Sequence, residues 1–255
     1  MTAPPADQAT LDLARELTQA AGQRTLRWFG ATDLEVERKG DGTPVTAADR
    51  DAERFLRTEL EAAFPGDGIL GEEEEPTPSS TGRRWIIDPI DGTKAFTCGV
   101  PLYSNLLALE DEHGIAVGVV NLPALGETVW AGRGLGCWSE RGPATVSHAR
   151  SLSGAYVMSS SFSTWTAPQL AAVEGAGAIL RTWGDGYGYA LVATGRVAAM
   201  VDPIVATYDV GPMPVLLDEA GGRFTDLAGS PTVEGGSGLG TNGLVHDELL
   251  ALLSR

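Results

Sequence analysis

The sequence predicts a layered α/β protein with a mixed sheet. Two amphipathic helical segments open the chain, and short apolar runs separated by glycine turns follow them to about residue 145. Beyond that point, strand-like and helical segments alternate, as they do in α/β folds. We therefore expect an N-terminal α+β half, residues 1–145, and a C-terminal α/β half, residues 146–255.

The first half begins with two helices. One is predicted over residues 7–29, where apolar side chains share one face and Gly30 provides a stop. The second begins after Thr46, which is followed three residues later by Asp49 in the pattern of a capping box. Pro65 and Gly66 end this helix.

Apolar runs of strand length follow the two helices. They cover residues 68–70, 85–87, 103–110, 115–121, 128–131 and 136–138. The last four are predicted to form two hairpins, because turn-forming residues separate them at 111–114 and 132–134. The first half is therefore expected to be a largely antiparallel sheet behind two helices.

The second half alternates strand-like and helical segments. Strands are predicted at 156–159, 178–182 and 197–201, and helices at 167–174, 187–194, 209–220 and 244–254. The helix at 209–220 contains Pro212 and Pro214, which a helix tolerates only near its first turn. His246 is expected on the surface of the last helix.

The composition is that of a globular protein, with 43% hydrophobic and 20% charged residues in 255. The net charge of −16 disfavours nucleic acid and anionic membranes as partners, because both would repel an acidic chain. A small phosphorylated metabolite remains possible, since bound cations reverse the local charge. Two cysteines outside any metal or redox pattern are expected to be reduced thiols, and the absence of a signal-like or membrane-spanning segment favours the cytoplasm.

The most informative motif is Asp88-Pro89-Ile90-Asp91-Gly92-Thr93. It directly follows the apolar run Trp85-Ile86-Ile87, so Asp88 and Asp91 are expected at the carboxyl end of a buried strand. Glu72 follows the neighbouring apolar run, and it can face the same space if the two strands pair. Clustered carboxylates of this kind are typical ligands of Mg²⁺. Glu74 and Glu75, by contrast, are expected to be solvated.

Three motifs in order resemble those of the inositol-monophosphatase-like family of Mg²⁺-dependent phosphatases. They are Gly71-Glu72-Glu73, the Asp88–Thr93 motif with Phe96, and Tyr208-Asp209 leading to Glu219-Ala220-Gly221-Gly222. The resemblance covers nearly the whole chain and implies an αβαβα sandwich and a homodimer. The chain departs from the family at Tyr208, where Trp is usual.

The resemblance also implies site residues. Glu72, Asp88 and the carbonyl of Ile90 would hold one Mg²⁺, and Asp88, Asp91 and Asp209 a second, with a third ion near Glu72. Asp49 and Thr93 match the pair that orients and deprotonates the attacking water. The amides of Gly92 and Thr93 would bind phosphate oxygens. A capping role competes with catalysis for Asp49 and Thr46.

The segment from Arg181 to Tyr189 looks like the one that distinguishes histidinol-phosphate phosphatases within this family. Asp185 would contact the cationic amine of such a substrate, and Asp202 falls where the family places an acidic substrate contact. Capping of the next helix is the alternative role for Asp185. Gly186 and Gly188 make this segment less bulky than in the histidinol-phosphate enzymes, which as pocket-lining residues would indicate a larger or different substrate.

Histidinol phosphate is therefore the leading substrate. An inositol, cyclitol or sugar phosphate is the alternative, and a non-catalytic metal-binding relative is a third hypothesis from another class. The full set of expected ligand residues argues against the third.

Overall fold

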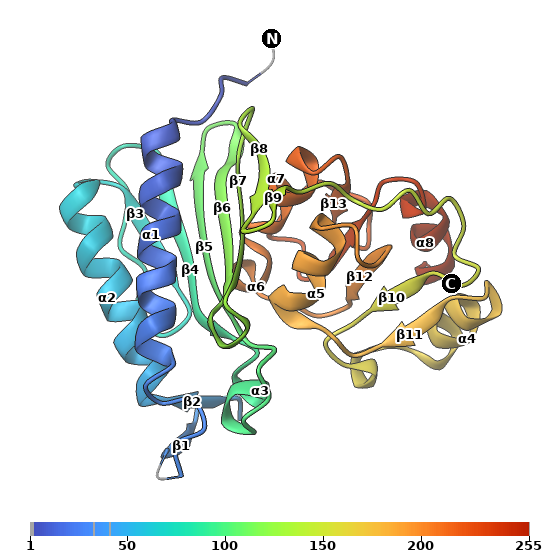
Figure 1. The fold of residues 1–255 in the computed structure, drawn as a ribbon, viewed down its shortest axis with the longest axis horizontal. Helices are drawn as coiled ribbons and strands as arrows, with labels where there is room; N and C mark the ends of the chain where they lie inside the picture. Colours follow the sequence, from blue (N-terminus) through green and yellow to red (C-terminus); the bar gives the residue numbers. More distant parts are fainter. Residues whose placement is uncertain (1–2, 33, 41, 255) are drawn as a thin grey trace.

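The computed structural model describes residues 3–32, 34–40 and 42–254. Figure 1 shows five layers, in which two helices, a seven-stranded sheet, a middle layer of helices, a five-stranded sheet and further helices follow one another. The αβαβα arrangement expected from the sequence is confirmed.

Helices α1 (Gln8–Thr25) and α2 (Ala47–Ala63) form the first layer and cover one face of the seven-stranded sheet. Helix α1 ends at Thr25, earlier than predicted, and residues 26–30 form turns. The predicted capping box of α2 is confirmed. The Thr46 amide donates to Asp49 Oδ2 at 2.8 Å, and the Ala48 amide donates to Thr46 Oγ1 at 3.1 Å.

The seven-stranded sheet contains all the strands predicted in the first half. In spatial order they are β3 (Gly68–Gly71), β4 (Arg84–Asp91), β5 (Ser104–Asp111), β6 (Gly114–Leu122), β7 (Glu127–Gly132), β8 (Gly136–Ser139) and β9 (Gly142–Pro143). Strands β3 and β4 pair in parallel, and the other pairs are antiparallel. Parallel pairing places the carboxyl ends of β3 and β4 side by side, as the interpretation of Glu72 and Asp88 requires.

A short ribbon that the sequence did not predict lies beside this sheet. Strands β1 (Val36–Arg38) and β2 (Pro44–Thr46) pair antiparallel, and helix α3 (Thr93–Thr97) follows β4. Figure 1 shows both features at the same end of the molecule.

The middle layer contains α5 (Asp185–Ala193), α6 (Thr207–Val210) and α7 (Met213–Glu219), which contact strands of one or both sheets. The prediction of one helix over 209–220 is therefore wrong, because α6 and α7 cover this stretch as two separate helices. The chain breaks at Gly211-Pro212, and Pro212 becomes the N-cap of α7 with Pro214 in its first turn. Proline has no amide hydrogen, so only a new helix start accommodates both residues.

The five-stranded sheet has the order β11-β10-β12-β14-β13 and is mixed. Its members are β10 (Tyr156–Met158), β11 (Ile179–Arg181), β12 (Ala199–Asp202), β13 (Arg223–Thr225) and β14 (Gly238–Thr241). Helices α4 (Ala167–Gly175) and α8 (His246–Leu253) form the outer layer.

The expected surface position of His246 is wrong. Its ring is buried, with Nε2 3.0 Å from Thr225 Oγ1 and Nδ1 2.9 Å from Thr241 Oγ1. The two hydroxyls satisfy both ring nitrogens, so a polar ring is accommodated at the start of α8. No helix in the described ranges is long and apolar enough to cross a membrane.

Candidate active site

A cavity of about 470 Å³ opens between the two sheets, where the carboxyl ends of β3, β4 and β12 meet the first turns of α3, α5 and α6. Its walls include nearly all of the predicted site residues. These are Glu72, Asp88, Ile90, Asp91, Gly92, Thr93, Asp185, Asp202 and Asp209. Asp49 is buried and is not part of the wall.

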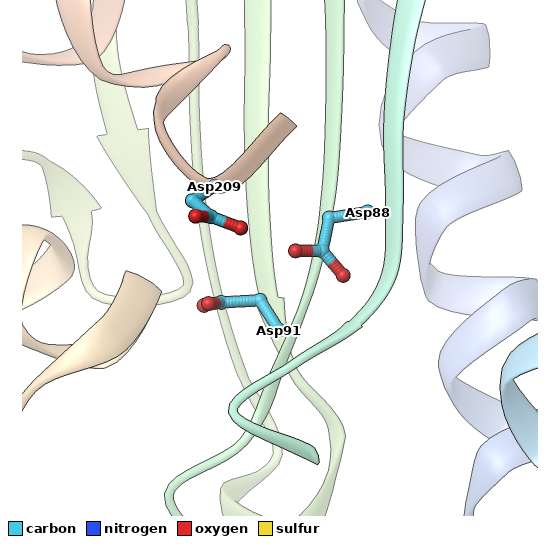
Figure 2. A group of neighbouring side chains, drawn as sticks. All are labelled: Asp88, Asp91 and Asp209. Carbon is cyan, nitrogen blue, oxygen red and sulfur yellow. The ribbon is translucent and has the colours of Figure 1, made fainter. Parts of the chain in front are cut away.

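Asp88, Asp91 and Asp209 form the centre of the cavity. Figure 2 shows their carboxylates turned toward one another from β4 and α6, and one oxygen of each lies within 4.8 Å of the others. Burial, followed by the neighbouring carboxylates, raises the pKa of Asp88 and Asp91 well above the usual range. Three buried carboxylates repel one another, so a divalent cation among them would offset a large electrostatic cost.

Hydrogen bonds fix the orientation of all three carboxylates, and the Ile90 amide donates to Asp88 Oδ1 at 3.1 Å. Ser104 Oγ and the Gly186 amide donate to Asp91 Oδ2 at 2.6 and 2.5 Å. The Ala206 amide donates to Asp209 Oδ2 at 2.7 Å, which closes the first turn of α6. Because each of these bonds uses only one carboxylate oxygen, the other oxygen is left for a cation. The donor set therefore fits a hard oxygen-ligated metal.

Glu72 reaches the same cavity from the end of β3, as predicted. Its Oε1 lies 2.6 Å from Lys39 Nζ, which also lies 2.7 Å from Glu73 Oε1. Lys39 lies just after β1, so the unpredicted β1–β2 ribbon positions its ammonium group beside Glu72 and Glu73. Glu74 and Glu75 are exposed, as expected.

Asp49 and Thr93 occupy different environments. Asp49 Oδ2 accepts from Thr46 Oγ1 at 2.6 Å, whereas Asp49 Oδ1 is buried and has no hydrogen-bond partner in the described part of the chain. Burial raises the pKa of Asp49 to about 6. Thr93 Oγ1 donates to the Ile90 carbonyl at 3.0 Å and keeps its lone pairs for a donor in the cavity.

Gly92 and Thr93 form the start of α3. Gly92 adopts a left-handed conformation, φ 81°, and is the N-cap without a side-chain cap. Glycine adopts this conformation without steric cost. The first amides of a helix have no acceptor within that helix, so those of Gly92 and Thr93 are available at the cavity wall.

Asp185 does not cap α5, so the capping alternative is wrong. Gly184 is the N-cap and has no side-chain cap, while Asp185 lies in the first turn with φ 54°. Its amide donates to Ser160 Oγ at 2.8 Å. Ser160 Oγ donates in turn to Asp202 Oδ2 at 3.0 Å, and the Ser160 amide donates to Asp202 Oδ1 at 2.9 Å. Ser160 therefore links the two predicted substrate contacts.

Asp202 is buried at the carboxyl end of β12, and burial raises its pKa to about 7. Gly186 and Gly188 are not among the residues that line the cavity. A Cβ on Gly186 would lie 2.4 Å from Ser104 Oγ, and one on Gly188 would lie 2.5 Å from Met200 Sδ. Close packing of α5 against both sheets explains these two glycines.

Polar residues to which the sequence assigned no role also lie at the site, and they include Lys39, Lys94, Ser160 and Tyr189. Lys94 could have been found, because it directly follows Thr93 in the central motif. Tyr189 could have been found as well, because it ends the segment from Arg181 to Tyr189 that the resemblance singles out. Lys39 and Ser160 reach the site only through tertiary packing and carry no local signal.

Known proteins agree with this architecture. The sequence model of the Inositol monophosphatase family matches residues 7–255. A protein of Chlorobaculum parvum named histidinol-phosphatase is 43% identical over 236 residues, which cover 90% of each chain. A histidinol-phosphatase of Mycobacterium tuberculosis is 42% identical over 253 residues, covering 96% of this chain and 97% of that protein. The solved structure of an IMPase from Thermotoga maritima superimposes with a TM-score of 0.88, 31% identity and 97% coverage of both chains.

Proposed function

This chain belongs to the inositol monophosphatase family, and from that premise we propose that it hydrolyses histidinol phosphate to histidinol and phosphate. Membership of the family and its histidinol-phosphatase relatives make it a phosphoric monoester hydrolase. The family is metal-dependent, and the acidic cluster provides a suitable place for metal ions.

The observation that carries the substrate assignment is the pair formed by Asp185 and Asp202. Both carboxylates line the cavity, and Ser160 connects the Asp185 amide to the Asp202 carboxylate. Neither carboxylate forms a salt bridge with a basic side chain among the described residues, and the charge of Lys94 only partly offsets the burial of Asp185. A substrate with a primary ammonium group would supply the missing positive charge. Relatives named histidinol-phosphatase, at 42–43% identity, support the same substrate.

Each remaining group of the site has a role in this proposal. Glu72, Asp88, the Ile90 carbonyl, Asp91 and Asp209 would hold up to three Mg²⁺ ions. Such ions supply charge neutralisation at the phosphate and acidify a water molecule. The Gly92 and Thr93 amides would hold phosphate oxygens.

Asp49 and Thr93 would orient and deprotonate the attacking water. The free lone pairs of Thr93 Oγ1 at the cavity wall support its part of this assignment. Asp49 Oδ1 is buried and unpartnered but lies outside the wall, so Asp49 would act on the water through a neighbouring group. A carboxylate with a raised pKa is suited to accept a proton near neutral pH. We further propose that the protein is a homodimer, which light scattering after gel filtration would test.

A phosphate-release panel tests the substrate. Histidinol phosphate, inositol 1-phosphate, fructose 1,6-bisphosphate and adenosine 3′,5′-bisphosphate would be compared with Mg²⁺ present. We expect the highest kcat/KM for histidinol phosphate. A higher value for inositol 1-phosphate would establish the cyclitol alternative, which the Thermotoga maritima IMPase supports.

The variant Asp185→Asn tests the recognition step. Loss of the carboxylate charge should lower kcat/KM for histidinol phosphate by about 1.5–3 kcal/mol, the scale of a hydrogen bond to a charged group. Hydrolysis of 4-nitrophenyl phosphate, which has no ammonium, should barely change. Asp202→Ala is compared in the same way. Equal losses on both substrates would exclude a role of Asp185 in amine recognition.

A further inference from the structure

Tyr189 has a buried hydroxyl without a partner at the wall of the active-site cavity. The side chain is 2% exposed, and its hydroxyl is among the few buried polar atoms in the described ranges that make no hydrogen bond. The same residue lines the cavity. Buried polar groups are normally satisfied, so a hydrogen-bonding group that reaches this hydroxyl from the cavity would complete its bonding.

Two glycines of β14 hold the tyrosine ring in place. A Cβ on Gly238 would lie 2.5 Å from the Tyr189 hydroxyl, and one on Gly240 would lie 2.8 Å from ring atom Cδ1. The ring of Phe224 lies 6.2 Å away, centroid to centroid. The tyrosine ring therefore packs against the glycine backbone of β14, and this packing fixes the position of its hydroxyl.

Tyr189 and Asp185 line the same cavity. Tyr189 lies four residues after Asp185 on α5, and the charge of Asp185 acts on its hydroxyl. Burial raises the pKa of Tyr189 well above its usual range, and four carboxylates add to this effect, so the hydroxyl stays protonated. In decreasing order of effect these carboxylates are Asp202, Asp209, Asp91 and Asp185.

We propose that Tyr189 is a specificity-determining residue whose hydroxyl oxygen accepts a hydrogen bond from the substrate ammonium group held by Asp185 and Asp202. An ammonium group has three N–H donors and no acceptor. Two carboxylates accept two of these bonds, and the tyrosine oxygen accepts the third. A substrate hydroxyl has a single donor, so it complements three acceptors poorly. This inference rests on the proposed substrate.

The variant Tyr189→Phe tests the inference, because phenylalanine keeps the ring and removes only the hydroxyl. We expect kcat/KM for histidinol phosphate to fall about tenfold to a hundredfold, as for a hydrogen bond to a charged group. Hydrolysis of 4-nitrophenyl phosphate, which has no amine, should fall by a much smaller factor. Inhibition of that reaction by histidinol, which keeps the amine, should weaken by the same factor.

A matched control is Tyr103→Phe. Tyr103 is also buried, but its hydroxyl lies 3.1 Å from Thr25 Oγ1 and does not line the cavity. This control should lower the melting temperature without changing the preference between the two substrates. Tyr189→Phe should leave the melting temperature unchanged or raise it, because it removes an unsatisfied buried hydroxyl.

The outcomes separate this inference from the proposed function. A wild type that does not prefer histidinol phosphate to inositol 1-phosphate would overturn the proposed function, and the role of Tyr189 with it. A wild type with the preference and a Tyr189→Phe variant that retains it in full would overturn the role of Tyr189 alone. Equal losses on both substrates in Tyr189→Phe would also overturn it, since the hydroxyl would then act on the metal centre or the fold.

Discussion

The carboxylate of Glu53 occupies the space that a side chain at Gly71 would need. A Cβ on Gly71 would lie 2.1 Å from Glu53 Oε1. Glu53 is fully buried on α2, and it accepts from the Glu73 amide at 2.7 Å and from the Arg57 guanidinium at 2.8 Å. The buried Glu53–Arg57 ion pair therefore supports the turn that carries Glu72.

This relationship predicts the effect of Gly71→Ala. The added methyl group must displace Glu53, so we expect a loss of about 1–3 kcal/mol in the free energy of unfolding. Metal affinity should fall as well, because the turn carrying Glu72 would move. Urea denaturation and titration calorimetry with Mg²⁺ measure the two effects.

The matched control is Gly175→Ala. A methyl group on Gly175 would meet no atom within 4 Å, and the residue lies at the end of α4, so its substitution should be neutral. Similar behaviour of the two variants would show that Glu53 does not constrain the turn.

Asp88→Asn tests the metal cluster. An amide cannot replace the negative charge at the centre of the three carboxylates, so turnover should fall by at least ~10²-fold. Wild-type activity should disappear with a chelator and return with added Mg²⁺. Phosphate release and metal titration are the measurements. Asp218→Asn, which changes a carboxylate outside the cavity, should have no effect on either. Full turnover in chelator would refute a metal-dependent mechanism.

Thr93→Ala tests the attacking water. Removal of the hydroxyl should lower kcat by about 10²–10⁴-fold while metal binding is mostly retained, as for a lost proton-transfer contact. Thr97→Ala provides a control within α3, because the Thr97 hydroxyl donates only to the Lys94 carbonyl, at 3.2 Å. If Thr93→Ala abolished metal binding without a separate effect on kcat, the role assigned to this hydroxyl would be wrong.

His246 predicts a pH dependence of stability. Burial, followed by the charge of Arg223, lowers the pKa of His246 from 6.5 to about 4. Below pH 6.5 the unfolded chain binds a proton that the folded protein does not. The free energy of unfolding should therefore decrease from pH 6.5 toward pH 4, with a slope of at most ~1.4 kcal/mol per pH unit from this group.

Comparison of the wild type with His246→Gln at pH 7.5 and pH 5.0 isolates this effect. The stability difference between the two proteins should shrink at the lower pH, since only the wild type titrates there. An unchanged difference for His246→Gln would contradict the assigned pKa.

Local sequence signals predicted much of this protein. Apolar periodicity indicated most strands and helices, and the capping box at Thr46 and Asp49 was read directly from residue types three positions apart. The central motif identified Asp88 and Asp91, since both follow one buried strand. These features depend on neighbours in the chain, and therefore the sequence alone carries them.

Tertiary structure decided the rest. The meeting of Asp209 with Asp88, the buried position of His246 and the support of Gly71 by Glu53 all join residues that are not neighbours in sequence. The packing of Gly238 against Tyr189 also joins residues that are far apart in the sequence. Such contacts depend on how helices pack between two sheets, and helix packing is set by the complementary shapes of many side chains at once. The residues of the three-carboxylate cluster could thus be named from the sequence, whereas the acceptors around the proposed ammonium site became visible only in the folded chain.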